Sequence, residues 1–347
     1  MEDHILSQLP GRLLPWYEEN RRALPWRADR EPYHIWLSEI MLQQTRVEAV
    51  KGYYARFLEA LPTVAALAEC DDDALHKLWE GLGYYSRVRN LKKAAQVIMD
   101  KHGGVFPSDY EDILALPGIG AYTAGAISSI AFGQPRAAVD GNVLRVLARL
   151  RNDEEPIDLP ACKQRVQREL EAVYPTDRPG AFTQALMELG ATVCVPNGEP
   201  KCEACPCWDL CRGKDRWKEL PVKLPKRQKK QEHRTVFLLR CEDRYAIEKR
   251  PNKGLLAGLW QFPNVSGNLT EEEALRWAEE RGLATRELER QLNRSHIFTH
   301  IRWEMRGYYL RVERRTPDYT WMTLREIDEQ AALPTAFRQF REEIEDV

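Results

Sequence analysis

The chain has 347 residues, of which 43% are hydrophobic and 30% are charged, with a formal net charge of -2. This length suggests two domains. The sequence contains no run of about 18 apolar residues, so it predicts no membrane span. The near-neutral charge balance excludes a polycation, so binding to nucleic acid must come from local basic patches. Eight cysteines are too few for a disulfide scaffold. The N-terminus lacks a signal-peptide pattern, so we expect a cytoplasmic protein with reduced thiols.

Residues 1–217 are expected to form an almost wholly helical domain. Apolar residues recur at helical spacing in segments 38–61, 73–85, 87–103 and 121–132. Glycines and prolines stand where one helix should end, which fits an all-α domain. These residues are Pro62, Gly81, Gly103, Pro107, Pro117 and Gly133.

The stretch "LPGIGAYTAGAIS" contains two glycines, Gly118 and Gly120, immediately before a predicted helix. Glycines allow a tight turn with free N–H groups, and the positive end of the following helix favours an anion. A plain turn between two helices is the alternative. We interpret residues 113–130 as a helix–hairpin–helix that binds a DNA phosphate without reading sequence.

Five of the eight cysteines fall between residues 194 and 211. Four of them are separated by seven, two and five residues, so their thiolates can converge on a metal centre without long loops. The spacing alone does not separate one zinc ion from a four-iron cluster. Cys207 is too close to Cys205 to join them, which leaves as ligands Cys194, Cys202, Cys205 and Cys211.

Residues 218–234 are expected to be a basic interdomain linker, with Pro221 and Pro225 breaking any regular structure. After it, residues 234–250 read as two strands and 296–312 as a strand or hairpin. Helices are expected at 270–282 and 335–345. Residues 235–347 therefore form a second, α+β domain.

Two carboxylates stand out in the helical half. Glu39 is expected near the start of a helix, in "WLSEIMLQQT", and Asp140 precedes another helix in "AAVDGNVLRV". Each alone also fits a bland role, a surface position for Glu39 and a helix cap for Asp140.

The segments "SEIMLQQTRV", "GLGYYSRVRNLKKAA", "LPGIGAYTAGAI" and "VDGNVLRV", followed by the cysteines, occur in one order along the chain. Together they resemble the endonuclease III superfamily of DNA glycosylases and, more narrowly, its MutY family, which removes adenine mispaired with 8-oxoguanine. The resemblance covers nearly the whole chain. It implies a helical barrel, a subdomain with a 4Fe-4S cluster and a Nudix-like terminal domain that checks the opposite base.

The resemblance also implies residue roles. Glu39 matches the acid that protonates adenine at N7, and Asp140 matches the aspartate that stabilises the oxocarbenium sugar. A closed apolar pocket would raise the pKa of Glu39, whereas a polar setting would keep Asp140 charged. Tyr122 replaces the lysine of bifunctional relatives, so we expect little lyase activity. Asn142 is expected to orient Asp140 or the sugar-phosphate.

Further positions match residues that contact the two bases. The adenine pocket is implied to contain Trp26, Arg27 and Glu188, although an exposed helical glutamate is the alternative for Glu188. The residues that wedge beside 8-oxoguanine or read it are implied to be Gln44, Thr45, Leu82, Tyr84, Phe298, Thr299 and His300.

Three features depart from the family pattern. Glu279, Glu280 and Gly282 fit a Nudix hydrolase, but Leu275 and Arg276 replace the Arg-Glu pair needed for magnesium and pyrophosphate, which indicates a fold retained for recognition. Thr299 stands where the family has serine. The first cysteine gap has seven residues instead of six, which Gly198 and two prolines can absorb.

The sequence therefore predicts a monomeric adenine glycosylase that acts on duplex DNA with 8-oxoguanine:adenine or guanine:adenine mispairs, near the nucleoid if the source is bacterial, and not at a membrane. One alternative is an endonuclease III-like pyrimidine glycosylase and lyase. The other is a non-catalytic DNA-binding protein with zinc.

Overall fold

The computed structural model describes residues 4–225 and 228–344, so two residues of the expected linker and three at each end of the chain lie outside the described residues. The chain forms two compact units. One comprises the described residues up to Glu69 together with Arg89–Pro225, and the other comprises Cys70–Val88 and the residues from 228 onward. No helix among the described residues is long and apolar enough to cross a membrane.

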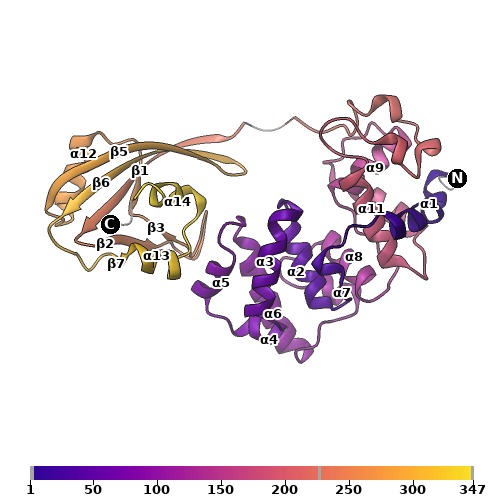
Figure 1. Ribbon diagram of the computed structural model, residues 1–347, viewed down its shortest axis with the longest axis horizontal. Coiled ribbons are helices and arrows are strands. Elements are labelled where there is room, and N and C mark those ends of the chain that lie inside the picture. The colour runs from indigo at the N-terminus through magenta and orange to yellow at the C-terminus, as the bar shows by residue number, and fades with distance from the viewer. Residues whose placement is uncertain (1–3, 226–227, 345–347) are drawn as a thin grey trace. The chain divides into compact units, whose positions relative to one another are not determined.

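The first unit is helical, as predicted (Figure 1). Short 3-10 turns occur at Pro25–Arg27 and, in the cysteine segment, at Cys202–Ala204, Trp208–Leu210 and Lys214–Arg216. Its helices are α1 (His4–Asn20), α2 (Pro32–Leu42), α3 (Val47–Ala60), α4 (Val64–Glu69), α6 (Ser86–His102, which starts in the second unit), α7 (Tyr110–Leu114), α8 (Ala121–Ile130), α9 (Gly141–Arg151), α10 (Pro160–Glu171) and α11 (Pro179–Thr192).

The segment 38–61, which has apolar residues at helical spacing, is divided between two helices. Helix α2 ends at Leu42 and α3 starts at Val47, and Gln44 between them has a left-handed backbone with φ 59°. The apolar periodicity continues through both helices, and a break of about one turn does not interrupt it. Because α2 begins at Pro32, Glu39 lies in its second half and not, as was predicted, near a helix start.

Helix α9 is the central element of one helical core. All of its residues from Val143 to Leu150 are buried, among side chains of α1 and α11 such as Leu9, Leu13 and Leu186. Burying a leucine or valine stabilises the fold by about 1.5–3 kcal/mol. Because α9 is enclosed on all sides, polar side chains that it carries are held in fixed positions.

The second unit contains a mixed sheet and three flanking helices, besides α5 (Asp72–Leu78). The strand order is β3-β2-β1-β6-β5, with β4 paired to β1 and β7 to β2, and β1 runs parallel to β6. The elements are β1 (Lys230–Cys241), β2 (Arg244–Lys249), β3 (Trp260–Gln261), β4 (Asn264–Ser266), α12 (Glu271–Glu280), β5 (Thr285–Ile297), β6 (Ile301–Val312), β7 (Thr320–Thr323), α13 (Leu324–Gln330) and α14 (Thr335–Arg341).

Alternation along β1 sends its side chains to two cores, one on each face of the sheet. Val236 and Leu238 pack with α13 and α14, whereas Phe237 and Leu239 pack with α12. The α+β expectation is confirmed, including the hairpin at 296–312. The first strand of that hairpin starts earlier than expected, at Thr285, because its charged residues hide the alternation.

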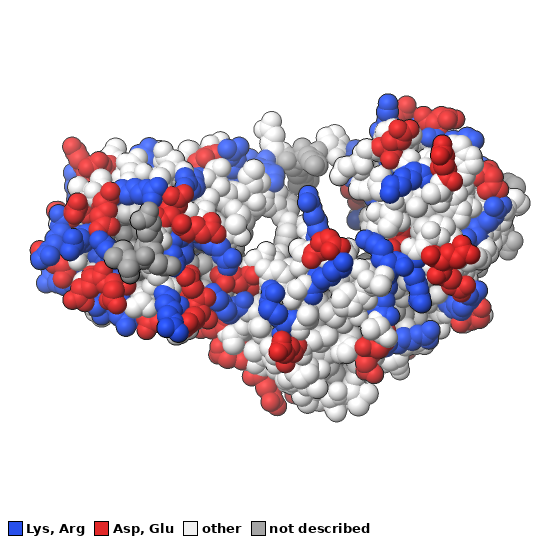
Figure 2. Space-filling model, viewed as in Figure 1, with Lys and Arg blue, Asp and Glu red and all other residues white. Residues whose placement is uncertain are grey.

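Acidic and basic side chains are mixed over the visible surface of both units in Figure 2. This mixture agrees with the net charge of -2. An anionic ligand must therefore be bound by a local arrangement of side chains and not by the charge of the whole chain.

Candidate active site and cysteine pocket

Glu39 and Tyr122 meet where α2 packs against the start of α8. Glu39 is only 6% exposed, and its Oε2 accepts a hydrogen bond from the Tyr122 hydroxyl. Tyr122, which stands where bifunctional relatives are expected to have lysine, is therefore a direct hydrogen-bond partner of the predicted acid.

Burial raises the pKa of Glu39, the hydrogen bond from Tyr122 opposes the rise, and the negative charge of Asp140 adds to it; together they bring this pKa to about 7. A substantial fraction of this carboxyl group is thus protonated at neutral pH, and the protonated state is the one that a general acid needs. Burial also raises the pKa of the Tyr122 phenol well above its ordinary value. Tyr122 therefore remains a neutral hydrogen-bond donor.

Asp140 is the N-cap of α9. Its Oδ1 accepts from the backbone N–H of Val143 at 2.8 Å, and its Oδ2 accepts from Asn142 Nδ2 at 2.7 Å. Asp140 therefore does cap a helix, which was the alternative role considered for it. This role does not exclude chemistry, because Asp140 lines the same cavity as Glu39 and Tyr122.

The setting of Asp140 is less polar than expected. Burial raises its pKa above the ordinary aspartate value, and the hydrogen bonds from Val143 and Asn142, with the nearby Arg145 charge, oppose that rise. Ionisation of Asp140 therefore depends on these donors.

Asn142 is itself tightly held. Arg145 Nη2 donates to Asn142 Oδ1 at 2.8 Å and to the Gly190 carbonyl at 2.8 Å. Gly190, in α11, approaches so closely that an added Cβ would lie 2.6 Å from Asn142 Cβ. Arg145 was not predicted as a site residue. A charged residue within an otherwise apolar helix is nevertheless a sign, visible in the sequence, that its side chain has a specific partner.

The predicted adenine-pocket residues line a cavity of about 200 Å³ together with Glu39, Asp140 and Thr45. Trp26 and Arg27 come from the 3-10 turn before α2, and Glu188 comes from α11. Glu188 is 1% exposed, so the reading as an exposed helical glutamate was wrong.

Glu188 is held by two arginines. Arg22 Nε donates to it at 2.7 Å and Arg27 Nη2 at 2.8 Å. Hydrogen bonds from Arg22 and Arg27 outweigh burial and lower the pKa of Glu188 to about 2. Arg22 was missed by sequence reasoning, since nothing in "ENRRALPWR" separates it from a surface arginine.

Gln44 lines a larger adjoining cavity of about 740 Å³, which Glu39, Tyr122, Asp140 and Asn142 also line. The hairpin glycines lie just before α8. Gly118 has φ +78°, and a Cβ there would lie 2.5 Å from Asn90 Cβ, so only glycine fits. Gly120 is the N-cap of α8. Tyr122 in the first turn of α8 thus joins the hairpin to the candidate active site.

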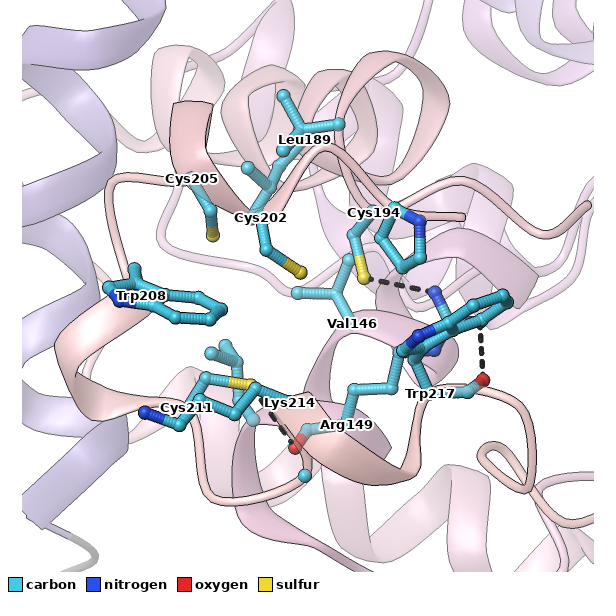
Figure 3. Close-up of a pocket in the computed structure, with 14 residues that line it drawn as sticks. Val146, Arg149, Leu189, Cys194, Cys202, Cys205, Trp208, Cys211, Lys214 and Trp217 are labelled. Carbon is cyan, nitrogen blue, oxygen red and sulfur yellow. Dashed lines mark hydrogen bonds between the residues drawn. The ribbon is translucent and has the colours of Figure 1, made fainter. Parts of the chain in front are cut away.

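The four predicted cysteine ligands line one cavity in the first unit (Figure 3). Cys207 does not line it and is fully buried in the helical core, as expected for a spectator. Within 4–225 and 228–344, no group of three His, Cys, Asp or Glu side chains converges so as to hold a single metal ion. The sulfurs are instead distributed around the cavity wall.

The seven-residue gap is accommodated by a short loop. Gly198 adopts a left-handed backbone with φ +77°, and the Lys201 N–H donates to the Val193 carbonyl at 3.0 Å. This bond closes the loop, so Cys194 and Cys202 line the same cavity.

Helix α9 also supports the cysteine pocket. Arg149 Nη1 donates to Cys194 Sγ at 3.4 Å, and Arg145 Nε donates to the Cys194 carbonyl at 2.9 Å (Figure 3 shows the first of these). Burial raises the pKa of Cys205 to about 12, so its thiolate requires a cation beside it. Arg145 and Arg149, four residues apart, were not predicted as supports.

Comparison with known proteins places the chain in a family. Residues 37–175 match the HhH-GPD superfamily of base excision DNA repair proteins, and residues 235–343 match a NUDIX domain. Adenine DNA glycosylases of Homo sapiens and of Buchnera aphidicola from Acyrthosiphon pisum are 34% and 33% identical to the chain. The matches cover 95% and 87% of this chain, and 72% and 85% of those proteins.

The chain belongs to the adenine DNA glycosylase family. Its helical unit is also similar to a thermostable thymine-DNA glycosylase, with a TM-score of 0.55 and 29% identity over 61% of this chain and 97% of that one. A trapped endonuclease III–DNA covalent intermediate gives a TM-score of 0.52 at 25% identity, over 60% of this chain and 97% of that one. The predicted family and two-part fold are therefore confirmed, and the chain is a base-excision DNA glycosylase.

The remaining residues that were predicted to recognise the lesion lie in the second unit. Tyr84 is 47% exposed with φ 47°, whereas Leu82 is buried, which fits a wedge less well. Thr299 Oγ1 donates to the Tyr84 hydroxyl at 3.4 Å.

Residues 298–300 form the turn of the β5–β6 hairpin. Phe298 packs against His296 and Trp303, with ring centroids 4.5 Å and 4.9 Å away, while Thr299 and His300 are exposed. The aromatic contact anchors the turn and leaves its polar tip accessible.

Proposed function

We propose that this glycosylase hydrolyses the N-glycosidic bond of adenine opposite 8-oxoguanine, or opposite guanine, in duplex DNA. The carrying observation is that a buried glutamic acid, Glu39, with a pKa near 7, lines the same cavity as the carboxylate of Asp140. Such a pair meets the requirement for one protonated and one ionised carboxyl around a scissile glycosidic bond.

The reaction requires that adenine leave the base stack and enter the cavity beside Glu39. Glu39 donates its proton to N7 of adenine, the glycosidic bond breaks, and its electron pair departs with the protonated base. Positive charge develops on the deoxyribose, where Asp140 stabilises it. Water then adds to the sugar carbon and loses a proton.

Tyr122 lacks an amine and cannot form a Schiff base with the sugar, which supports base removal without strand cleavage. Its hydroxyl holds the Glu39 carboxyl in one orientation. Asn142 does the same for Asp140. These contacts reduce the reorganisation needed before proton transfer.

Arg27 and Glu188 can recognise the purine edges if their mutual ion pair opens to the base. Arg27 has a donor for a ring nitrogen, and Glu188 accepts from the exocyclic amino group. Trp26, packed edge-on against Tyr54 with centroids 5.6 Å apart, provides an apolar wall. These partners favour adenine over bases that lack the amino donor.

The opposite base would be read by Gln44 and Thr45 between α2 and α3 and by the Tyr84 and Thr299 hydroxyls. The pairing of those two hydroxyls supports a shared role for them. The Nudix-like domain then serves recognition and not hydrolysis.

The cysteine residues suit a 4Fe-4S cluster held by Cys194, Cys202, Cys205 and Cys211. All four thiols line one cavity, and four cysteine thiolates are the ligand set of a 4Fe-4S cluster. Bound there, the cluster would crosslink four points of the chain. We expect iron and sulfide in the purified protein, and zinc without iron would contradict this assignment.

The test is a single-turnover assay with duplexes containing adenine opposite 8-oxoguanine, adenine opposite guanine, or an oxidised pyrimidine. We expect adenine release from the first two, without strand scission and without covalent trapping by borohydride. Release of the pyrimidine with trapping would instead identify an endonuclease III-like lyase. Light scattering of the free protein should give a monomer.

A further inference from the structure

Two lysines line the reaction cleft without a role in the chemistry proposed above. The 740 Å³ cavity that contains Glu39 and Asp140 is also lined by Lys163 and Lys223. All four residues belong to the helical unit. Ala121, the first residue of α8, lines it too, so the start of the helix that follows the predicted phosphate-binding hairpin borders the same cleft.

Lys223 is presented by a fixed segment and not by a free linker. The Ile157 N–H donates to the Val222 carbonyl at 3.1 Å, and the Leu224 N–H donates to Asp158 Oδ2 at 3.0 Å. Lys223 therefore lies exposed between two residues whose backbones are anchored. A preorganised backbone lowers the entropic cost of binding a ligand.

Lys163 is presented by α10, in the first turn of that helix. Gln167, one turn further along, also lines the cleft, as residues four apart share a helix face. The cleft wall thus receives one ammonium group from a helix and one from the start of the linker.

Neither ammonium group has an acidic partner among the described residues. Neighbouring cations differ in this respect: Arg165 pairs with Asp153 at 2.6 Å, and Arg151 pairs with Glu169 at 2.7 Å. Two unpaired cations facing a cleft provide a site for an anion, and a nucleic-acid backbone supplies phosphates at regular intervals.

We propose that Lys163 and Lys223 form a phosphate-binding site for the DNA strand that carries the base to be removed. The first residues of the linker are then part of the DNA-binding surface. The site adds affinity without sequence preference, and it holds the strand beside Glu39 and Asp140. This inference rests on the proposed function for the identity of the strand.

The first experiment measures the affinity of the full-length protein for undamaged duplex DNA over a range of salt concentrations. Each phosphate contact contributes about 0.9 to the slope of log K against log salt, so Lys163→Gln and Lys223→Gln should each lower the slope by about that amount. The double variant should lose about twice as much.

The matched control is Lys101→Gln, which removes an exposed lysine of α6 that does not line the cleft. Lys223→Arg should keep the slope, because it keeps the charge. A double variant with the slope of Lys101→Gln would overturn the proposal.

The second experiment localises the contact with single neutral methylphosphonate linkages, moved one at a time along the adenine strand. At one linkage near the adenine, the neutral substitution should weaken binding by the wild type. It should leave the affinity of the double variant unchanged, because the two lysines that would contact that phosphate are already absent. Equal losses in both proteins at every linkage would refute the site. Adenine release assayed separately distinguishes this failure from failure of the proposed function.

Discussion

Two regions of the molecule carry glutamate or aspartate residues that match catalytic motifs, but the environments of these carboxylates differ. In the helical unit, Glu39 is buried beside Tyr122, and Asp140 lines the same cavity. In the Nudix-like unit, Glu279 and Glu280 match the hydrolase motif but lie exposed at the end of α12. Burial of the first pair raises the pKa of both carboxyl groups.

The difference shows that burial and hydrogen-bond partners, more than the presence of carboxylates in a motif, give these residues their chemistry. Glu39 gains its raised pKa from desolvation. Burial has this effect because a low-dielectric site disfavours the charged form of a carboxyl group. The predictions below test this contrast, from the largest expected effect to the smallest.

Replacing Glu39 with Gln should give the largest loss. Glutamine keeps the shape and can still accept from Tyr122, but it has no proton to donate. We expect single-turnover adenine release to fall about 10²–10⁴-fold, the usual contribution of a general acid. Binding to the mispaired duplex should persist, and a wild-type rate would remove Glu39 as the acid.

Asp140→Asn should reduce the rate by about 10²–10³-fold, because the charge opposite the developing cation is lost. Asparagine caps helices about as well as aspartate, so the thermal unfolding temperature should stay near that of the wild type. A large drop in that temperature with an unchanged rate would assign Asp140 a structural role only.

The pH dependence follows from the directions of the two pKa shifts. Above a pH of about 7, the protonated fraction of Glu39 falls, so the rate should drop about tenfold per pH unit. At low pH, protonation of Asp140 should also reduce the rate, starting above the ordinary aspartate range. Duplex binding measured at each pH separates weaker binding from slower chemistry, and a rate that stays flat through pH 8 would contradict this view.

Tyr122→Phe should have a smaller effect on the rate of adenine release, and it should shift the pH dependence of that rate in one direction. The tyrosine bond lowers the pKa of Glu39, so removing it should move the alkaline limb of the rate profile to higher pH. A shift to lower pH would mean that the hydroxyl stabilises the protonated acid.

Glu279→Gln with Glu280→Gln should change nothing measurable in adenine release or in stability, since substitutions at exposed sites usually stay within about 0.5 kcal/mol. The wild type should also show no magnesium-dependent hydrolysis of nucleoside diphosphate derivatives. Detection of such hydrolysis, and its loss in this variant, would erase the contrast between the two regions.

Much of this organisation was predictable because it rests on local patterns. Helical periodicity and the Gly and Pro stops identified the all-α half, and the close spacing of Cys202 and Cys205 indicated the sulfur site. The break at Gln44 was not predictable, because the apolar pattern continues across it.

The partners of the candidate site were harder to predict because they are distant in the chain. Glu188 meets Arg22 across 166 positions, and Tyr122 meets Glu39 across 83. Local patterns identify candidate acids, but the fold decides which of them are buried and which donors they receive.

The contact between Gly190 and Asn142 restricts which substitutions the molecule can accept. A methyl group at position 190 would press on Asn142 from a helix more than 45 residues away in sequence. Any larger side chain must displace the residue that orients Asp140. Variation at this apparently inert glycine should therefore appear as a repair defect in a protein that still folds.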